Sequence, residues 1–271
     1  MTAVSAPAKI NLALVVGPIR PDGKHEVVTI LQKITLADTI NLEPAPTTVV
    51  TGFVEDTIVG DALRALAEAA GHGAGWRVEI EKRIPVAAGL GGGSADAAAA
   101  LRAANASLPR PLSPDHLRAL AARLGADVPF FLAPGTMLGT GDGSTLAPIS
   151  VPTGYAILLA LPNGEVKAST GSVYCAFDAR GGAEGFDDRR ARLLDLVGAL
   201  RTPLDFAGLP PNDLASSPFA ATLQALGAFR ADVSGAGPTV YALFEDERRA
   251  RAAADALGAT ARTWVVAPER P

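Results

Sequence analysis

The stretch Pro85–Leu101, PVAAGLGGGSADAAAAL, decides the fold class of this 271-residue chain. Just before it, residues 77–82 (RVEIEK) alternate apolar and polar side chains as a strand does, and Pro85 lacks the N–H group that a strand ladder needs. Four glycines then fall within five residues, and an alanine-rich run of high helix propensity follows. The pattern predicts a strand, a glycine loop and a helix, with Ser94 as the helix N-cap and Asp96 in the first turn.

The glycine loop has the composition of a phosphate-binding site. Glycine allows positive φ angles and close approach of the backbone to a ligand, and the first N–H groups of a helix attract anions. A loop that only packs a helix against a strand is the alternative, but it needs fewer glycines. The Walker-type loop is excluded because no lysine follows the glycines. The dinucleotide fingerprint is excluded because Ser94 stands where it requires Gly or Ala and Pro85 interrupts the junction.

Other local patterns outline the first half of the chain. Residues 33–43 (KITLADTINLE) alternate on either side of Ala37-Asp38, which predicts two strands joined by a turn. Ser113-Pro114 opens a second helix that Gly125 closes. Residues 124–143 (LGADVPFFLAPGTMLGTGDG) are expected to form loop and a short strand.

The pattern restarts at residue 155 with the buried-type strand YAILLAL, so residue 150 is the best candidate boundary between domains 1–150 and 151–271. We expect helices at 170–178, 188–200 and 213–226. A strand, the tight turn SGAGP at 234–238, a second strand, a charged helix at 245–257 and a last strand follow. This order indicates an α+β architecture with a mixed, partly antiparallel sheet and helices on one side.

Composition narrows the classes of partner. The chain has 24 Lys plus Arg and 28 Asp plus Glu, so its net charge of −4 does not favour nucleic acid. The single cysteine and the scattered His25, His72 and His116 do not favour a structural metal. No run of about 18 or more apolar residues and no secretory signal is present, so we expect no membrane partner and a cytoplasmic location.

Lys9 and Asp127 are the candidates for chemistry beside the glycine loop. Lys9 lies in PAKINL, where a solvated lysine at a strand edge is an equally good interpretation. Asp127 lies among apolar neighbours in GADVPFFL, where its alternative is an N-cap or turn aspartate. A Lys–Asp pair beside phosphates explains both, because the cation keeps the carboxylate ionised and helps to activate a substrate hydroxyl whose proton the carboxylate accepts.

Three segments carry a resemblance to a known family: residues 7–12 (PAKINL), 85–101 and 233–244 (VSGAGPTVYALF). They resemble the three ordered motifs of the GHMP kinases. With RPDGKHEVVTILQKITLADTI, LGADVPFFL, STGSVY and PNDL, the chain more closely resembles the branch that uses ATP to phosphorylate the 2-hydroxyl of a cytidine-diphosphate-linked methylerythritol in non-mevalonate isoprenoid synthesis. The resemblance implies a two-domain GHMP kinase fold, with an N-terminal domain like domain 2 of ribosomal protein S5 and a ferredoxin-like C-terminal domain.

The resemblance also implies roles for individual residues. It makes Lys9 and Asp127 the catalytic pair of an ATP-dependent phosphotransferase with an alcohol acceptor, for which Mg²⁺ is expected with ATP. The implied ATP-binding residues are Pro85, Gly89, Leu90, Gly91, Gly92, Gly93 and Ser94. The implied substrate-binding residues are Asn11, Lys24, His25, Thr170 and Tyr174, with His25 bonded to the cytosine and Tyr174 stacked on it. The pattern assigns neither metal ligands nor an oligomeric state.

Some positions depart from the branch or have a second interpretation. Lys24 stands where relatives have an aromatic residue, Thr57-Ile58 replaces an Asn-Leu pair near the adenine, and Gly141–Ser144 (GDGS) replaces a GRGE-like segment. Asn212-Asp213 is explained equally well as a helix N-cap, and SGAGP as a plain hairpin turn or as a loop over the active site. The alternative functions are another GHMP small-alcohol kinase, of the homoserine or mevalonate type, and a nucleotide-binding protein without turnover.

Overall fold

The computed structural model describes residues 1–53, 58–71, 73, 75–165 and 169–269. The chain forms two compact units that alternate along the sequence. Unit 1 comprises Met1–Ala8, Leu36–Val86 and Gly91–Pro134, and unit 2 comprises Lys9–Thr35, Ala87–Leu90 and Gly135–Pro271. This division differs from a single boundary near residue 150, and the domains 1–150 and 151–271 stay a prediction.

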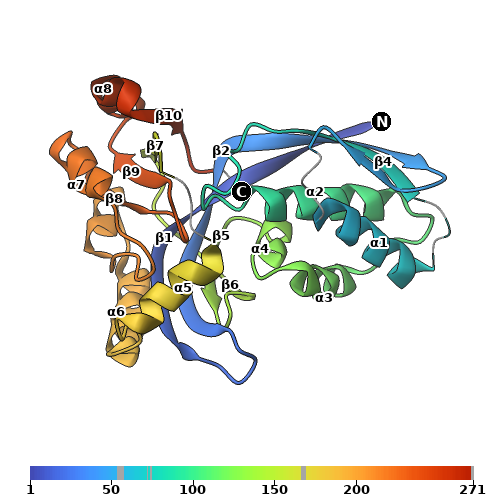
Figure 1. The fold of residues 1–271 in the computed structure, drawn as a ribbon, viewed down its shortest axis with the longest axis horizontal. Coiled ribbons are helices and arrows are strands. Elements are labelled where there is room, and N and C mark those ends of the chain that lie inside the picture. Colours follow the sequence, from blue (N-terminus) through green and yellow to red (C-terminus); the bar gives the residue numbers. More distant parts are fainter. Residues whose placement is uncertain (54–57, 72, 74, 166–168, 270–271) are drawn as a thin grey trace. The chain divides into compact units, whose positions relative to one another are not determined.

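Two long strands contribute to both units: β1 (Thr2–Ile19) and β2 (His25–Ala45), which pair with each other (Figure 1). The expected turn at Ala37-Asp38 is wrong, because β2 runs through it. The Asp38 side chain is fully buried, and its carboxylate accepts hydrogen bonds from the backbone N–H groups of Arg83 (2.5 Å) and Ile84 (2.8 Å). An aspartate that would otherwise favour a turn is therefore satisfied within a strand by a distant segment.

Unit 1 is a small sheet with helices on one face (Figure 1). Residues 39–45 of β2 pair antiparallel with β4 (Gly75–Glu81), and β3 (Val49–Thr51) pairs parallel with β4. The helices of the unit are α1 (Ile58–Ala70), α2 (Gly92–Ser107), α3 (Pro114–Leu124) and α4 (Val128–Leu132). Most alanines of α2 are buried, since α1 and α4 both contact this helix, so the alanine-rich run provides small side chains for close packing.

The local sequence predictions for unit 1 are confirmed for one strand and one helix and are wrong for one segment. The strand at 77–82 is confirmed as β4. Helix α3 is confirmed with Ser113 as its N-cap, Pro114 in its first turn and Gly125 at its end. Residues 124–143 were expected to contain no helix, which is wrong, because α4 buries Val128 and two phenylalanines and has a proline in its first turn.

Unit 2 contains the remaining strands. β5 (Thr136–Thr140) pairs with residues 29–31 of β2 and with β6 (Thr145–Ile149). A second sheet has the order β10-β7-β9-β8, and each of its pairs is antiparallel. Its strands are β7 (Ala156–Pro162), β8 (Arg230–Val233), β9 (Val240–Phe244) and β10 (Ala261–Val266). The expected mixed sheet is therefore wrong for this part of the chain.

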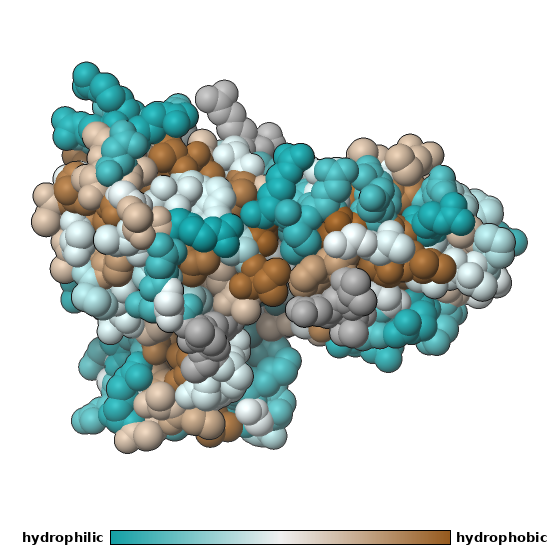
Figure 2. All heavy atoms as spheres, turned by 45° about the horizontal axis from the view of Figure 1, so that its top comes forward, coloured by the Kyte–Doolittle hydropathy of each residue, from teal (hydrophilic) through white to brown (hydrophobic). Residues whose placement is uncertain are grey.

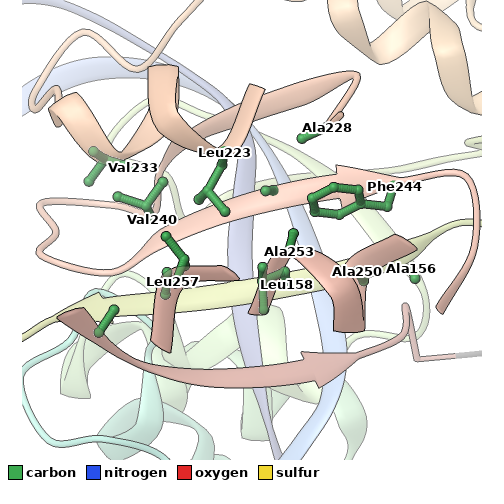
Figure 3. Close-up of a cluster of buried hydrophobic side chains, with 13 residues drawn as sticks. Ala156, Leu158, Leu223, Ala228, Val233, Val240, Phe244, Ala250, Ala253 and Leu257 are labelled. Carbon is green, nitrogen blue, oxygen red and sulfur yellow. The ribbon is translucent and has the colours of Figure 1, made fainter. Parts of the chain in front are cut away.

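The helical segments of unit 2 are α5 (Thr170–Ala179), α6 (Phe186–Ala199), α7 (Pro218–Ala225), α8 (Glu247–Leu257) and the short 3₁₀ turns η1 (Pro203–Gly208) and η2 (Gly258–Thr260). Leu223 of α7 and Leu257 of α8 pack with Leu158, Val240 and Phe244 in one buried cluster (Figure 3). The helices expected at 170–178 and 188–200 and the strand–turn–strand–helix–strand ending are confirmed.

The helix expected over 213–226 is shorter than predicted. It begins at Pro218, and the Ser217 side chain caps it by accepting a hydrogen bond from the backbone N–H of Phe219. The interpretation of Asn212-Asp213 as the cap of this helix is therefore wrong, and both side chains have other partners, described below.

The face of the molecule in Figure 2 intersperses hydrophilic residues with small hydrophobic areas. Such mixing is ordinary for a folded protein surface. His116 is exposed, whereas His72 lies outside the described residues. None of the helices in the described part of the chain is both long and apolar enough to cross a membrane.

Candidate active site

Lys9 begins a buried chain of hydrogen bonds in unit 2. Its side-chain Nζ donates to Oδ1 of Asn11 (2.7 Å), Nδ2 of Asn11 donates to the hydroxyl of Thr29 (2.8 Å), and that hydroxyl donates to the carbonyl of Ala13 (2.7 Å). Lys9 and Asn11 are each only 5% exposed, so Lys9 is not a solvated lysine at a strand edge. Because each bond fixes the next, the amide oxygen of Asn11 faces the ammonium group.

The part of the glycine loop in unit 2 lies against the same strand. The backbone N–H of Lys9 donates to the carbonyl of Leu90 (2.9 Å), and the Ser234 hydroxyl donates to the carbonyl of Gly89 (2.9 Å). Gly89 has φ +81°, and a Cβ atom there would lie 2.2 Å from the Ser234 carbonyl oxygen. Both the backbone angle and this close approach require glycine at position 89.

The turn 234–238 connects β8 to β9 as a hairpin, in which the N–H of Ser234 donates to the carbonyl of Thr239 (2.9 Å). A Cβ atom added to Gly235 would lie 3.5 Å from both Oδ1 of Asn11 and Nζ of Lys9, and 3.3 Å from the carbonyl oxygen of Gly89. The hairpin interpretation is confirmed, and the turn also lies beside Lys9. Unit 2 thus brings together residues 9–11, 89–90 and 234–237, which are far apart in sequence.

In unit 1, the glycine loop leads into α2. The N-cap is Gly91, with φ 72°, rather than Ser94, which lies in the first turn. The prediction of a serine cap is wrong because a left-handed glycine lets the chain enter the helix three residues earlier. The cap residue has no side chain, and no side-chain cap hydrogen bond forms at the start of α2 among the described residues. This is the arrangement in which a helix N-terminus binds an anion.

A buried ionic cluster of Lys82, Asp38 and Asp96 lies close to the start of α2. The sequence analysis did not predict this cluster. Nζ of Lys82 lies 2.6 Å from Asp38 and 2.7 Å from Asp96, and both carboxylates are inaccessible to solvent. Burial raises the pKa of Asp96 to about 7, against the opposing effect of Lys82, and Oδ1 of Asp96 has no hydrogen-bond partner among the described residues. A Cβ atom at Gly92 would lie 3.4 Å from the Lys82 ammonium, so this cation lies next to the first turn of α2.

Asp127 is half-buried and occupies the N-cap position of α4, but its side chain makes no cap hydrogen bond. Of the alternative interpretation, the capping role is wrong, whereas the position of Asp127 in a turn is confirmed. Asp127 belongs to unit 1 and Lys9 to unit 2, and their pairing stays a prediction.

His25 lies in a second group of side chains, formed with helix α5 in unit 2. Its ring is stacked on Tyr174 (centroids 4.7 Å apart), and its Nε2 lies 2.8 Å from Oδ1 of Asp178. Phe177 meets the His25 ring edge-on at 5.8 Å. Tyr174, Phe177 and Asp178 are three and four residues apart, so they share one face of α5. Asp178 was not a sequence candidate, although the i+4 spacing from Tyr174 in a predicted helix could have indicated it.

Lys24 is bound to Asp142 across two turns. Nζ of Lys24 lies 2.5 Å from Oδ2 of Asp142, whose Oδ1 accepts hydrogen bonds from the hydroxyl (2.6 Å) and the N–H (3.1 Å) of Ser144. Burial opposes ionisation of Asp142, but Lys24 and Ser144 outweigh it and lower its pKa to about 2. Two departures from the family pattern, at positions 24 and 142, are therefore one ion pair.

The remaining candidates have less distinctive surroundings. Thr170 is exposed at the start of α5, where Ser169 is the N-cap, and Pro85 is half-buried after β4. Thr57 lies outside the described residues. In the part of the chain that the structure describes, no group of three or more His, Cys, Asp or Glu side chains could hold a metal ion.

Comparison with known proteins identifies the family. Residues 57–135 match the model of the GHMP kinases N-terminal domain, and residues 217–263 match that of the GHMP kinases C-terminal domain. A crystal structure of 4-(cytidine 5'-diphospho)-2C-methyl-D-erythritol kinase is similar with a TM-score of 0.79 and 32% identity, covering 99% of this chain and 100% of that one. A mevalonate kinase structure, with a TM-score of 0.76 and 14% identity over the whole of both chains, shares the fold. The expected two-domain GHMP kinase fold is confirmed.

Curated relatives agree along nearly the whole chain. The 4-diphosphocytidyl-2-C-methyl-D-erythritol kinase of Rhodococcus jostii (strain RHA1) is 40% identical, over 94% of this chain and 88% of its own length. The kinase of the same name from Leifsonia xyli subsp. xyli (strain CTCB07) is 38% identical, over 99% and 95%. This chain therefore belongs to the 4-diphosphocytidyl-2-C-methyl-D-erythritol kinase family of the GHMP kinases.

Proposed function

We propose that the protein transfers the γ-phosphoryl group of ATP to the 2-hydroxyl of 4-diphosphocytidyl-2-C-methyl-D-erythritol, which yields ADP and the 2-phosphate. The observation that carries the proposal is the buried network of Lys9, Asn11 and Thr29 beside Gly89 and the 234–237 turn, in a chain of this family. Such a network presents a positioned cation next to a loop suited to phosphate.

The separation of the two groups of side chains in unit 2 suits a substrate that carries a nucleobase at one end and the reacting hydroxyl at the other. Strand alternation places His25, Val27 and Thr29 on one face of β2, and Thr29 is bonded to Asn11. His25 and Thr29 are four residues apart, which corresponds to about 13 Å along a strand. This separation leaves room for a diphosphate between a nucleobase held at His25 and Tyr174 and a methylerythritol unit near Asn11 and Lys9, along a path that bypasses Val27, which is packed against Phe177 and Leu214.

The chemistry needs positioning and charge neutralisation more than a covalent intermediate. Phosphoryl transfer has a loose transition state whose charge spreads over the phosphate oxygens. In the proposed reaction, the Lys9 ammonium stabilises that charge, and Asp127 accepts or orients the proton of the attacking hydroxyl. Gly89–Ser94 binds the ATP phosphates through backbone N–H groups. Mg²⁺ bound with ATP would be held chiefly by the phosphates and would supply neutralisation of their charge.

An ADP-release assay tests the proposal, with the cytidyl substrate, homoserine and mevalonate supplied side by side. We expect turnover with the cytidyl substrate alone and a phosphorus NMR signal of a new phosphomonoester in the product. Turnover with homoserine or mevalonate alone would identify a different GHMP kinase. ATP binding without turnover of any of the three would indicate a nucleotide-binding protein.

A further inference from the structure

Asn212 is a buried residue in the segment before α7, and every polar group of its side chain has a partner. It is 8% exposed. Its Nδ2 donates to the carbonyls of Val233 (2.9 Å) and Gly235 (2.7 Å), and its Oδ1 accepts from the N–H of Leu214 (2.8 Å). A side-chain amide has two N–H donors, and both are used on the end of β8 and the turn that follows it.

The backbone of Asn212 is itself fixed by a buried ion pair. Its N–H donates to Oδ2 of Asp232 (2.8 Å), and that oxygen also lies 3.2 Å from the guanidinium of Arg230. Arg230 further donates to the hydroxyl of Tyr241 and to three backbone carbonyls, all in buried surroundings. The backbone of Asn212 is therefore fixed in place, and its side chain binds the turn from this fixed position.

The turn that Asn212 holds lies against the proposed transfer site. The Gly235 carbonyl that accepts from Asn212 belongs to the residue whose α-carbon faces Lys9, Asn11 and Gly89. The side chain of Asn212 makes the hydrogen bond to the Gly235 carbonyl, while the rest of the turn is held by the Ser234 hydroxyl on Gly89, by the N–H of Gly237 on Ser234 (2.9 Å) and by the N–H of Thr239 on Ala88 (3.3 Å). A larger side chain at position 235 could not replace the contact from Asn212, because the φ angle of Gly235 is +56° and its surroundings are tight.

We propose that Asn212 is a positioning residue for phosphoryl transfer: its two amide donors keep the turn 234–237 against Lys9, Asn11 and Gly89. The inference rests on the proposed function, since it assigns the role to the transfer step. It also explains why an amide is needed here. A carboxylate of the same shape has no donors and would face two carbonyl oxygens.

The test compares Asn212→Asp with Asn163→Asp. Asn163, an exposed residue of the same unit, is the control for the chemical change, because its Nδ2 also donates to a backbone carbonyl, that of Ala259 in η2 (2.7 Å). We expect Asn212→Asp to lower kcat about 100-fold, the order of loss that a displacement near 1 Å produces at a transfer site. The KM for the cytidyl substrate should stay within about threefold, since Asn212 reaches the His25 group only indirectly, through Leu214, which packs against Phe177. Asn163→Asp should leave both constants within about twofold.

Hydrogen–deuterium exchange gives a readout that does not depend on the acceptor. In Asn212→Asp, the amides of residues 234–239 should exchange at least tenfold faster than in the wild type, and in Asn163→Asp they should not. If Asn212→Asp fails to fold, Asn212→Ser, which keeps one donor, is measured in its place and should show the same pattern with a smaller effect.

The outcomes separate this inference from the proposed function. An unchanged kcat, a change in KM alone, or unchanged exchange at 234–239 would overturn the role of Asn212. If the wild type turns over another acceptor, the proposed substrate is wrong, and the same kcat comparison is made with that acceptor. If the wild type turns over none of the three acceptors, hydrogen–deuterium exchange at residues 234–239 alone decides whether Asn212 holds the turn.

Discussion

The two ends of the face of β2 that carries His25 and Thr29 are built in different ways. At Thr29, the side chains of Lys9, Asn11 and Thr29 are almost inaccessible to water and bond to one another. At His25, the ring is 9% exposed, but the partner carboxylate of Asp178 is 41% exposed and the nearby Lys24 side chain is 55% exposed. One end is buried throughout, whereas the other, open end has exposed partners on α5 and on a turn.

This difference indicates which residues are expected to determine kcat and which are expected to determine KM. Electrostatic interactions are stronger where water is excluded, and a fixed polar network costs little reorganisation during the reaction. Exposed ion pairs are screened and contribute less. We therefore expect changes at the buried end to alter kcat and changes at the open end to alter KM, and the following variants test that division.

Lys9→Met should have the largest effect. Removing a positioned cation from the transition state is expected to lower kcat by about 1,000-fold, while binding of CDP, measured by calorimetry, changes little. Lys33→Met is the control, because Lys33 is comparably buried in the same unit, at 7% exposure, and lies outside the proposed site. If both variants lose the same activity, a general loss of stability explains the result, and the buried end has no special role in rate.

Asp127→Asn tests whether a residue of unit 1 contributes to the rate of phosphoryl transfer. The amide keeps the shape of the side chain but cannot accept the hydroxyl proton, so kcat should fall about 100-fold with a nearly unchanged KM. Asp115→Asn, at an exposed position of α3, is the control. Undiminished turnover of Asp127→Asn in the ADP-release assay would remove Asp127 from the proposed mechanism.

The sequence was sufficient for features that are encoded locally. The glycine cluster before the alanine-rich run indicated a strand, loop and helix, and the Ser113-Pro114 and Gly125 signals gave the limits of α3. The ending from β8 to β10 followed from alternation and from the glycine turn. In each case, neighbouring residues indicate the local path of the backbone, although distant partners such as Asn212 and Ser234 hold the glycine turn and the glycine loop in place.

Features that depend on distant partners could not be predicted in this way. Asp38 looks like a turn residue until Arg83 and Ile84, more than forty positions away, donate to it. Asn212 and Asp213 look like a helix cap, but Asn212 binds Gly235, and Asp213 accepts from the N–H of Val16 and from Arg189. The same holds for the ion pair of Lys24 with Asp142, whose two members each appeared as an isolated departure.

His25→Ala tests the open end, where the effect should be on binding. Loss of the ring that stacks on Tyr174 is expected to raise the KM for the cytidyl substrate about tenfold, with kcat within about threefold. Asp178→Asn should have a smaller effect in the same direction, since it weakens only the bond that orients the ring. Asp195→Asn, exposed on α6, serves as its control. A fall in kcat with an unchanged KM would contradict the division between the two ends.

Lys24→Met should have the smallest effect, because it removes an ion pair whose cation is more than half exposed. Such a contact contributes below about 1 kcal/mol, so the KM for the cytidyl substrate should rise by only about threefold. The stability effect has a defined pH window. The pKa of Asp142 lies near 2 in the folded protein, below its usual value of 3.8, so the pair stabilises the fold above about pH 4 and this contribution is lost as the pH falls towards 2.

Urea unfolding of the wild type and Lys24→Met at several pH values measures that window. The difference in unfolding free energy should be constant between pH 5 and about 7 and should shrink below about pH 4, because Asp142 then becomes protonated in both states. Arg251→Met, which removes an exposed pair with Glu247 on α8, should give a similar stability loss without any change in KM. An unchanged KM in Lys24→Met would show that Lys24 joins two turns but does not contact the substrate. A tenfold rise would show instead that this exposed cation contributes as much to substrate binding as His25, whereas a fall in kcat with an unchanged KM would contradict the division between the two ends of β2.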